Sequence, residues 1–207
     1  MEPINRYLDA AILKPELTRD EAAAAIRESV AWQTKTVCVR PCDIALAKEL
    51  TAGTGTGVSC VLAFPHGCTT TAVKEAEARE YVALGADEID MVANYGRIRS
   101  ADWDYVEKDI RAVARVCNAS KVTLKVIFET CWLTADEIAR TTEICVAAGA
   151  DFVKTSTGFS TAGATVEAVR VMLDTARGRI KVKPSGGIRD RETALAYVGT
   201  ARPASLA

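Results

Sequence analysis

The sequence has only one histidine, His66, among its 207 residues, and this scarcity argues against a catalytic triad centred on histidine. Seven cysteines are present, but they are odd in number and contain no Cys-x-x-Cys pair, which argues against a disulfide framework and a zinc ribbon. Cys38 and Cys42 are four positions apart, yet Pro41 lies between them and histidine partners are lacking. We expect no metal ion, and we expect most cysteines to be buried, reduced core residues.

Long apolar runs and an excess of one charge are also missing. No stretch approaches the roughly 18 apolar residues of a membrane-spanning helix. The 26 Lys and Arg residues nearly balance 27 Asp and Glu residues, so neither a nucleic acid nor a membrane is an expected partner. The N-terminal segment lacks the charged-then-apolar pattern of a secretory signal. These features predict a cytoplasmic enzyme with one domain spanning residues 1–207.

Short β-branched runs alternate with longer segments that carry helix signals. Alternation with short connections is typical of parallel strands joined by right-handed helical crossovers. Eight such runs predict a closed (β/α)8 barrel of the TIM type rather than an open sheet. The predicted strands are Tyr7–Ile12, Thr36–Arg40, Val58–Phe64, Glu88–Asn94, Val122–Glu129, Phe152–Gly158, Ile180–Gly187 and a stub near Arg202–Leu206.

Local signals place the helix ends between these strands. Thr18 with Glu21 and Thr134 with Glu137 have the spacing of capping boxes. Three further N-caps and three C-terminal glycines are predicted, at Ser100, Thr165, Asp190, Gly85, Gly149 and Gly178. The barrel is expected to end at its eighth strand without a closing helix, which leaves an outer face for missing chain or for a second subunit, as in a homodimer.

Alternation of side chains along the strands predicts a polar interior. Because the outer face of each barrel strand packs under helices, the apolar set must point outward and the opposite set inward. In Val122–Glu129, for example, this rule turns Lys125 inward and Leu124 outward. Applied to all strands, it brings six residues to one interior: Asp9, Cys38, Asp90, Lys125, Lys154 and Lys183.

Buried charges of this kind have two interpretations. They can form an ion-pair network that satisfies itself, or they can belong to an active site. Several of them lie late in their strands, near the C-terminal mouth where barrel enzymes hold their chemistry. Clustered lysines are expected to lower one another's pKa, which prepares an uncharged amine that can attack a carbonyl.

The same residues carry a resemblance to the deoxyribose-phosphate aldolase family. The matching segments follow the family order over nearly the whole chain: Leu8-Asp9, Leu13-Lys14-Pro15, Val37-Cys38-Val39, Glu88–Asn94, Leu124–Thr130, Asp151–Ser160 and Val182–Arg189. The most specific of them are Phe-Val-Lys-Thr-Ser-Thr-Gly-Phe around Lys154 and Lys-x-Ser-Gly-Gly-Ile-Arg from Lys183 onward.

The resemblance implies a class I aldolase that needs neither a metal nor an organic cofactor. It implies that Lys154 forms a Schiff base with an aldehyde or sugar-phosphate substrate, while Asp90 and Lys183 transfer protons. Lys183 would also help to lower the pKa of Lys154. The remaining residues that it assigns to substrate binding and support are Lys125, Asp9, Cys38, Thr155, Gly158, Gly186, Gly187 and Ser205.

The C-terminal end departs from the family pattern. Where the family has a Gly-x-Ser-Ser-like phosphate-binding run, this chain has Arg202–Ala207, with Pro203 and only Ser205 of the paired serines. Barrel phosphate sites use backbone N–H groups of the loops after strands seven and eight, and proline offers none. This predicts weak phosphate binding and use of unphosphorylated aldehydes.

Two other functions stay open. One is a related lysine aldolase acting on a different aldehyde or keto-acid. The other is a non-catalytic barrel that binds a sugar phosphate or a protein, although the joint presence of Asp90, Lys154 and Lys183 argues against it. His66 is interpreted as a loop residue outside the chemistry.

Overall fold

The computed structural model describes residues 3–200, and its centre is a curled sheet of seven parallel strands. Each strand pairs with its neighbours in sequence order, from β1 to β7. The strands are β1 Asp9–Ile12, β2 Thr36–Val39, β3 Gly57–Leu62, β4 Glu88–Val92, β5 Thr123–Ile127, β6 Phe152–Lys154 and β7 Lys181–Lys183. They are shorter than predicted, because the residues that follow several of them form the loops at the mouth of the barrel.

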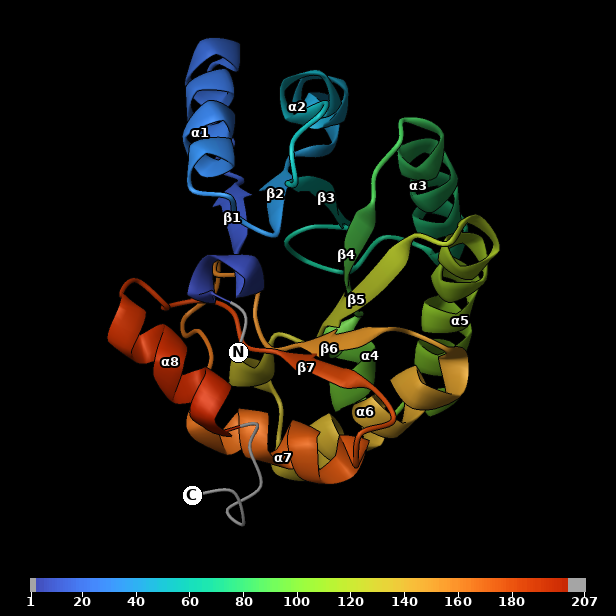
Figure 1. Cartoon of the computed structure of the whole chain (residues 1–207). Coiled ribbons are helices and arrows are strands. Elements are labelled where there is room, and N and C mark those ends of the chain that lie inside the picture. The colour runs from blue at the N-terminus through green and yellow to red at the C-terminus, as the bar shows by residue number, and fades with distance from the viewer. Residues whose placement is uncertain (1–2, 201–207) are drawn as a thin grey trace.

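Helices cover the outer side of this sheet (Figure 1). The α-helices are α1 Arg19–Ala31, α2 Ile44–Thr51, α3 Thr71–Ala83, α4 Tyr95–Arg99, α5 Trp103–Ser120, α6 Ala135–Ala148, α7 Val166–Ala176 and α8 Arg191–Thr200. Three short 3-10 helices are η1 Ile4–Tyr7, η2 Pro41–Asp43 and η3 Thr130–Trp132. Among the helices of residues 3–200, none combines the length and apolar character needed to cross a bilayer.

Most of the predicted helix caps are confirmed. Thr18 and Thr134 form capping boxes with Glu21 and Glu137, in which backbone and side chain bond reciprocally. The Thr165 side chain accepts a hydrogen bond from Ala168 N at 3.1 Å, and the Asp190 carboxylate accepts one from Thr193 N at 2.8 Å. Gly85, Gly149 and Gly178 all have positive φ at helix ends.

The prediction of Ser100 as an N-cap is wrong. Ser100 ends the short helix α4, and its hydroxyl donates back to Gly96 O at 2.8 Å. Helix α5 begins later, at Trp103 after Asp102. The error arises because Ser and Asp bond to backbone groups at either end of a short helix, so sequence alone cannot separate the two ends.

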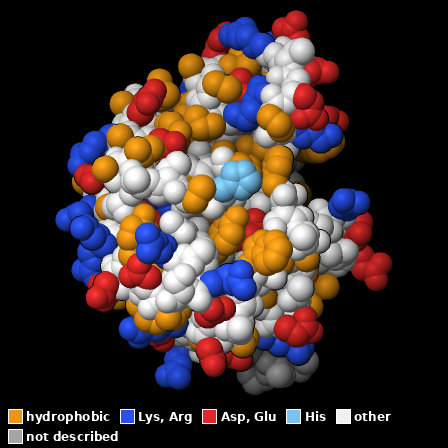
Figure 2. Space-filling model, turned by 180° about the vertical axis from the view of Figure 1, so that it is seen from behind, with side chains coloured by type: hydrophobic (Ala, Val, Ile, Leu, Met, Phe, Trp, Pro, Cys, Tyr) orange, Lys and Arg blue, Asp and Glu red, His pale blue; other side chains and the backbone are white. Residues whose placement is uncertain are grey.

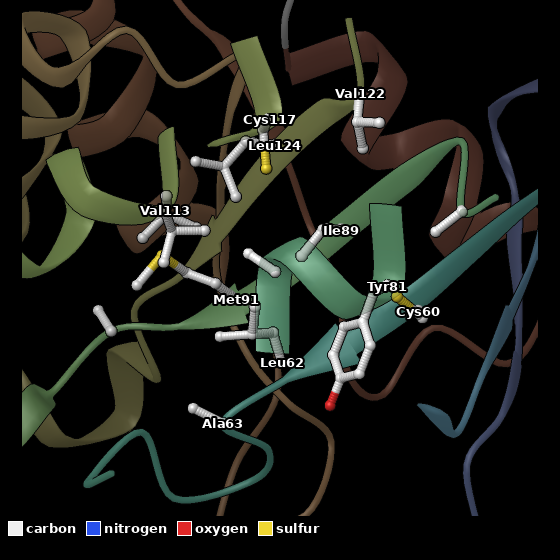
Figure 3. Close-up of a cluster of buried hydrophobic side chains, with 14 of the residues drawn as sticks. Cys60, Leu62, Ala63, Tyr81, Ile89, Met91, Val113, Cys117, Val122 and Leu124 are labelled. Carbon is white, nitrogen blue, oxygen red and sulfur yellow. The ribbon is translucent and has the colours of Figure 1, made fainter. Parts of the chain in front are cut away.

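The hydrophobic core lies between the sheet and the helices. Leu124 of β5, which was predicted to face outward, belongs to this core, and so do Ile89 and Met91, which alternate with the inward Asp90 on β4. Figure 3 shows part of it, where side chains of β3, β4 and β5 meet Tyr81 of α3 and Val113 and Cys117 of α5. The predicted alternation of outward core residues and inward polar residues is therefore confirmed on these strands.

One buried ion pair lies outside the barrel, between α3 and α5. Lys74 Nζ donates to Asp109 Oδ2 at 2.6 Å and to Val92 O at 3.1 Å. Thr71 Oγ1 donates to the other carboxylate oxygen at 2.8 Å. Both charged side chains are almost fully buried, so this pair fixes α3 and α5 to the C-terminal end of β4.

Seven of the eight predicted barrel strands are observed in the described residues. The first predicted strand begins at Asp9, because Ile4–Tyr7 form η1 instead. The predicted stub near 202–206 lies outside the described residues. Within residues 3–200 no strand pairs β7 with β1. The two edges approach there, since Lys183 of β7 donates to Tyr7 O at 3.0 Å, and α8 lies next to η1 (Figure 1).

Candidate active site

The pairing of the strands brings the predicted interior residues to one place. Asp90 of β4 is the register partner of Lys125 of β5. Lys154 of β6 is the partner of Ile127 on one side and of Lys183 on the other. Because Lys154 and Lys183 are the last residues of their strands, both lie toward the C-terminal end of the sheet. This is the end where barrel enzymes bind their substrates.

Asp90 is the centre of the set. Its Oδ2 accepts a hydrogen bond from Lys154 Nζ at 2.5 Å, and its Oδ1 accepts one from Lys125 Nζ at 2.8 Å. Ser59 of β3 also donates to Oδ1, at 3.0 Å. The Asp90 side chain is fully buried, and Lys154 is 8% exposed. The carboxylate thus holds the two lysines in a fixed arrangement.

A second carboxylate, Asp9, links the network to β7. Its Oδ2 lies 2.8 Å from Lys183 Nζ and 3.3 Å from Lys125 Nζ. Thr36 Oγ1 donates to its Oδ1 at 2.9 Å. Lys125 therefore contacts Asp9 and Asp90 together, and a third carboxylate, that of Glu88, also pairs with it. Three lysines and three carboxylates are thus linked by ion pairs in one network.

These contacts shift the proton affinities of the acids. Burial would raise the pKa of Asp90, but the charges of Lys125 and Lys154 outweigh it and hold that pKa well below its usual range. The pKa of Asp9 is lowered as well, since Lys125 and Lys183 outweigh the effect of burial. Both carboxylates are therefore ionised at neutral pH.

Lys154 shifts in the direction opposite to the sequence-based expectation. Burial alone would lower its pKa, but the adjacent Asp90 carboxylate raises the pKa above the ordinary lysine value. Lys125 acts in the expected direction and lowers it, but the direct contact with Asp90 is stronger. Lys154 rests as an ammonium ion, and it must lose a proton before it can attack a carbonyl.

Cys38 of β2 faces the same interior and is buried. Burial and the nearby Asp90 raise the pKa of its thiol to about 12. It is therefore a neutral thiol at physiological pH, not a reactive thiolate.

The predicted binding residues after Lys154 connect two mouth loops. The buried Thr155 hydroxyl donates to Ser185 O and accepts from Ser185 N, both at 3.0 Å. Gly158, Gly186 and Gly187 all have positive φ, which favours glycine. Ala164 N donates to Gly186 O at 3.1 Å, so the loops after β6 and β7 lie against each other beside Lys154. Ser205 lies outside the described residues.

A cavity of about 360 Å³ lies at the C-terminal end of the sheet, lined by residues that follow β3, β4, β5 and β6. Its polar floor includes Glu129, whose buried carboxylate accepts hydrogen bonds from Thr157 N at 3.2 Å and from Thr157 Oγ1. His66 is one of its lining residues, and Figure 2 shows the histidine at the surface with both hydrophobic and other atoms beside it. The lining residues are Pro65, His66, Tyr95, Gly96, Arg99, Glu129, Trp132, Thr157, Phe159 and Ser160.

A larger cavity, of about 510 Å³, lies at the opposite, N-terminal end of the sheet. Lys35, Lys48 and Asp87 are among its lining residues, and it reaches Glu88. Size alone would favour it as the substrate site. We assign the chemistry to the C-terminal end, because Lys154 and Lys183 are the last residues of their strands there.

Three polar residues of the interior had no role in the sequence-based interpretation. The alternation of side chains places Glu88 and Glu129 on the inward faces of Asp90 and Lys125, but it assigns them no function. It also turns Ser59 inward, whereas the donation of Ser59 to Asp90 depends on the register of β3 against β4 and could not be predicted. Within residues 3–200 no group of three His, Cys, Asp or Glu residues is placed to hold a metal ion.

Known proteins resemble this chain over almost its full length. The sequence profile described as "DeoC/LacD family aldolase" matches residues 6–204. A deoxyribose-phosphate aldolase of Exiguobacterium sp. is 47% identical over 194 residues, which cover 93% of this chain and 87% of the relative. Another, from Mannheimia succiniciproducens, is 46% identical and covers 95% of this chain and 87% of its own.

Solved structures of aldolases are similar to this chain as well. The protein titled "QR15, an Aldolase" has a TM-score of 0.91 at 41% identity and covers 97% of this chain and 89% of its own. The deoxyribose phosphate aldolase of Aeropyrum pernix, described as tetrameric, has a TM-score of 0.87 at 26% identity, with coverages of 95% and 83%.

Proposed function

This chain belongs to the DeoC/LacD family of aldolases, and we propose that it cleaves 2-deoxy-D-ribose 5-phosphate reversibly to D-glyceraldehyde 3-phosphate and acetaldehyde through a Schiff base on Lys154. The observation that carries the proposal is the contact of Lys154 Nζ with the buried Asp90 carboxylate at 2.5 Å. It gives a buried amine a proton acceptor at the mouth of the barrel.

The first step is formation of the imine. The Lys154 ammonium gives up its proton, with Asp90 as the acceptor in contact, and the free amine adds to the aldehyde carbon of the open-chain sugar. The proton then passes from Asp90 to the hydroxyl of the adduct, which leaves as water, and a positively charged iminium remains beside the ionised carboxylate. Asp90 stabilises this charge much as it stabilises the ammonium, because the nitrogen keeps its place beside the carboxylate.

The second step is cleavage of the C2–C3 bond. A base removes the proton of the C3 hydroxyl while the bonding electrons flow into the iminium, and glyceraldehyde 3-phosphate leaves. Asp90 and Lys183 are the proton-transferring groups in the proposal. Lys183 is connected to Asp90 through Asp9 and Lys125, so a proton can be redistributed within one network. Groups in this role contribute about 10²–10⁴-fold to the rate.

The last step releases acetaldehyde. The enamine left on Lys154 takes at C2 the proton that was removed from the C3 hydroxyl, and hydrolysis of the resulting iminium releases acetaldehyde and restores the Lys154 ammonium. The water released during imine formation is taken up again in this step, so the cycle consumes only the sugar phosphate.

Recognition of the phosphate is the weaker part of the proposal. Gly186 and Gly187 can offer backbone N–H groups near Lys154. Arg202–Ala207 departs from the family run. We expect weak phosphate binding, so the Michaelis constants for deoxyribose 5-phosphate and for deoxyribose should be similar. A far lower value for the phosphorylated sugar would contradict this.

Adduct formation on Lys154 and turnover of acetaldehyde separate the rival functions. A related lysine aldolase would form an adduct on Lys154 but would not turn over acetaldehyde as donor. A non-catalytic barrel would form none. The deoxyribose-phosphate aldolases that match this chain favour cleavage of deoxyribose 5-phosphate over both rivals.

The decisive experiment traps the intermediate. The protein is incubated with acetaldehyde, reduced with borohydride, and digested for peptide mass spectrometry. We expect the adduct on the peptide that carries Lys154. Lys154→Arg keeps the charge beside Asp90 but removes the nucleophile, and it should abolish labelling. Equal labelling of this variant, or no adduct on Lys154 in the unaltered protein, would refute the mechanism.

Three structural statements belong to the same proposal. The seven consecutive parallel strands and the TM-scores support a (β/α)8 barrel that ends at its eighth strand, in a single domain spanning residues 1–207. The tetramer described for the Aeropyrum pernix protein supports an oligomer, for which a homodimer is the simplest form. A cytoplasmic location fits the sequence.

A further inference from the structure

Glu88 is the third carboxylate of the ion-pair network, and the mechanism above gives it no task. It is the first residue of β4, two residues before Asp90, and it shares the inward face of that strand. Its Oε2 forms an ion pair with Lys125 Nζ. The side chain is 11% exposed and reaches the cavity at the N-terminal end, on the far side of the network from Lys154.

Lys125 connects Glu88 to the chemistry. The same ammonium group contacts Asp90 at 2.8 Å, and Asp90 in turn contacts Lys154 at 2.5 Å. The ion pairs therefore form a continuous series from one end of the barrel to the other. Lys125 is only 2% exposed, so water screens little of the interaction along this series.

The count of charges gives Glu88 its influence. With Glu88, the linked ion pairs comprise three lysines and three carboxylates, and their formal charge is zero. Without it, three lysines face only Asp9 and Asp90. An uncompensated positive charge in a buried site disfavours every protonated amine in that site.

We propose that Glu88 is a positioning residue for the Schiff-base lysine, and that through Lys125 and Asp90 it sets the pH at which Lys154 loses its proton. The inference rests on the proposed function, because it concerns the amine that forms the Schiff base. The reaction would thus be tuned by a carboxylate that never touches the substrate.

The other charged groups around Glu88 do not take this role. Lys35, Lys48 and Asp87 line the same cavity. Asp87 pairs with Lys48 at 3.2 Å, and both side chains are well exposed, so their charges are compensated locally and screened by solvent. Within the barrel, the groups that face the series are Asp9 and Lys183, which pair with each other, and the neutral Cys38 thiol.

The test is the pH dependence of adduct formation. The rate of borohydride-trapped acetaldehyde labelling on Lys154 is measured from acid to alkaline pH in the unaltered protein and in Glu88→Gln. The substitution keeps the shape of the side chain and removes its charge. We expect the acid limb of the profile to move to lower pH, by on the order of half a pH unit. Asp87→Asn, which removes the same charge at the neighbouring position, should leave the limb in place.

Folding is checked by thermal unfolding of each variant. If Glu88→Gln does not fold, Glu88→Asp carries the test, since it keeps the charge but withdraws it from Lys125 by one methylene. A smaller shift in the same direction is then expected. A purely structural role would lower stability without moving the limb, and an unmoved limb in the folded variant would overturn the inference. Absence of any Lys154 adduct in the unaltered protein would instead refute the proposed function.

Discussion

Thr155 follows the candidate nucleophile directly, and its side chain is engaged elsewhere. The hydroxyl exchanges two hydrogen bonds with the backbone of Ser185, both at 3.0 Å, and no part of Thr155 reaches solvent. The residue that the sequence pattern assigns to substrate binding thus holds the end of β6 to the loop after β7.

Replacement of Thr155 by valine should therefore destabilise the protein. Valine keeps the shape but leaves a buried N–H and C=O without partners, which costs about 1–3 kcal/mol. Urea unfolding of the two proteins measures the difference. Thr155→Ser keeps the hydroxyl and should recover most of the loss. A valine variant as stable as the unaltered protein would show that these hydrogen bonds contribute nothing.

At this scale the sequence predicts which residues meet, but not how they interact. The period of two placed Asp90 and Lys154 in one interior without any structural information. Their contact at 2.5 Å, which raises the pKa of Lys154, could not be predicted, because β4 and β6 are not neighbours in the sheet. Such a distance depends on the curvature of the strands between them.

At the scale of elements, the two mouth loops beside Lys154 are held together by a close approach of backbones. A Cβ atom placed on Gly163 would lie 2.2 Å from Gly186 O, which is far inside van der Waals contact. Gly186 belongs to the loop after β7, so these two loops can touch only because glycine stands at position 163.

Gly163→Ala should separate the loops. We expect a loss of about 1–3 kcal/mol in the free energy of unfolding, the usual cost of overpacking, and slower adduct formation on Lys154. Gly199→Ala is the matched control, because Gly199 is an exposed residue of α8 with open space around it. Alanine there should raise stability by about 0.5 kcal/mol. Equal effects of the two substitutions would contradict the close approach.

The helix ends show what can be predicted locally. Both capping boxes were predicted correctly, because a capping box involves residues only three positions apart. The strand ends were predicted too long, since Thr155 and Ser156 continue a β-branched or polar pattern while the chain has already left the sheet. Where a parallel strand stops depends on its partners, and these are distant in sequence.

At the scale of the whole molecule, the buried network makes stability depend on pH. Asp9 and Asp90 have folded-state pKa values below their ordinary values, so they stabilise the fold above about pH 4, the unfolded value. This contribution is lost as the pH falls below that value, because the unfolded chain binds those protons more readily.

The free energy of unfolding should therefore fall steeply between about pH 4 and pH 2. Urea titrations across this range measure the slope. Asn cannot bind a proton, so Asp90→Asn removes one group that binds protons more readily in the unfolded chain. The slope of unfolding free energy against pH should therefore become shallower by up to about 1.4 kcal/mol per pH unit. An unchanged slope would mean that Asp90 does not link folding to pH.

The fold as a whole was predictable only up to its closure. Alternating patterns gave a parallel α/β sheet covered by helices, because each βα unit is a local feature. Whether the last edge meets the first depends on the summed tilt of all strands, which no single segment determines.

The approach of β7 to β1 has a mechanical consequence. Consecutive strands are joined by backbone hydrogen bonds, but between β7 and the beginning of the chain the described polar contacts are those of one side chain, Lys183, with Tyr7 O and Asp9. The charge of a single lysine therefore links the first and seventh strands, where every other pair of neighbouring strands is joined by several backbone groups.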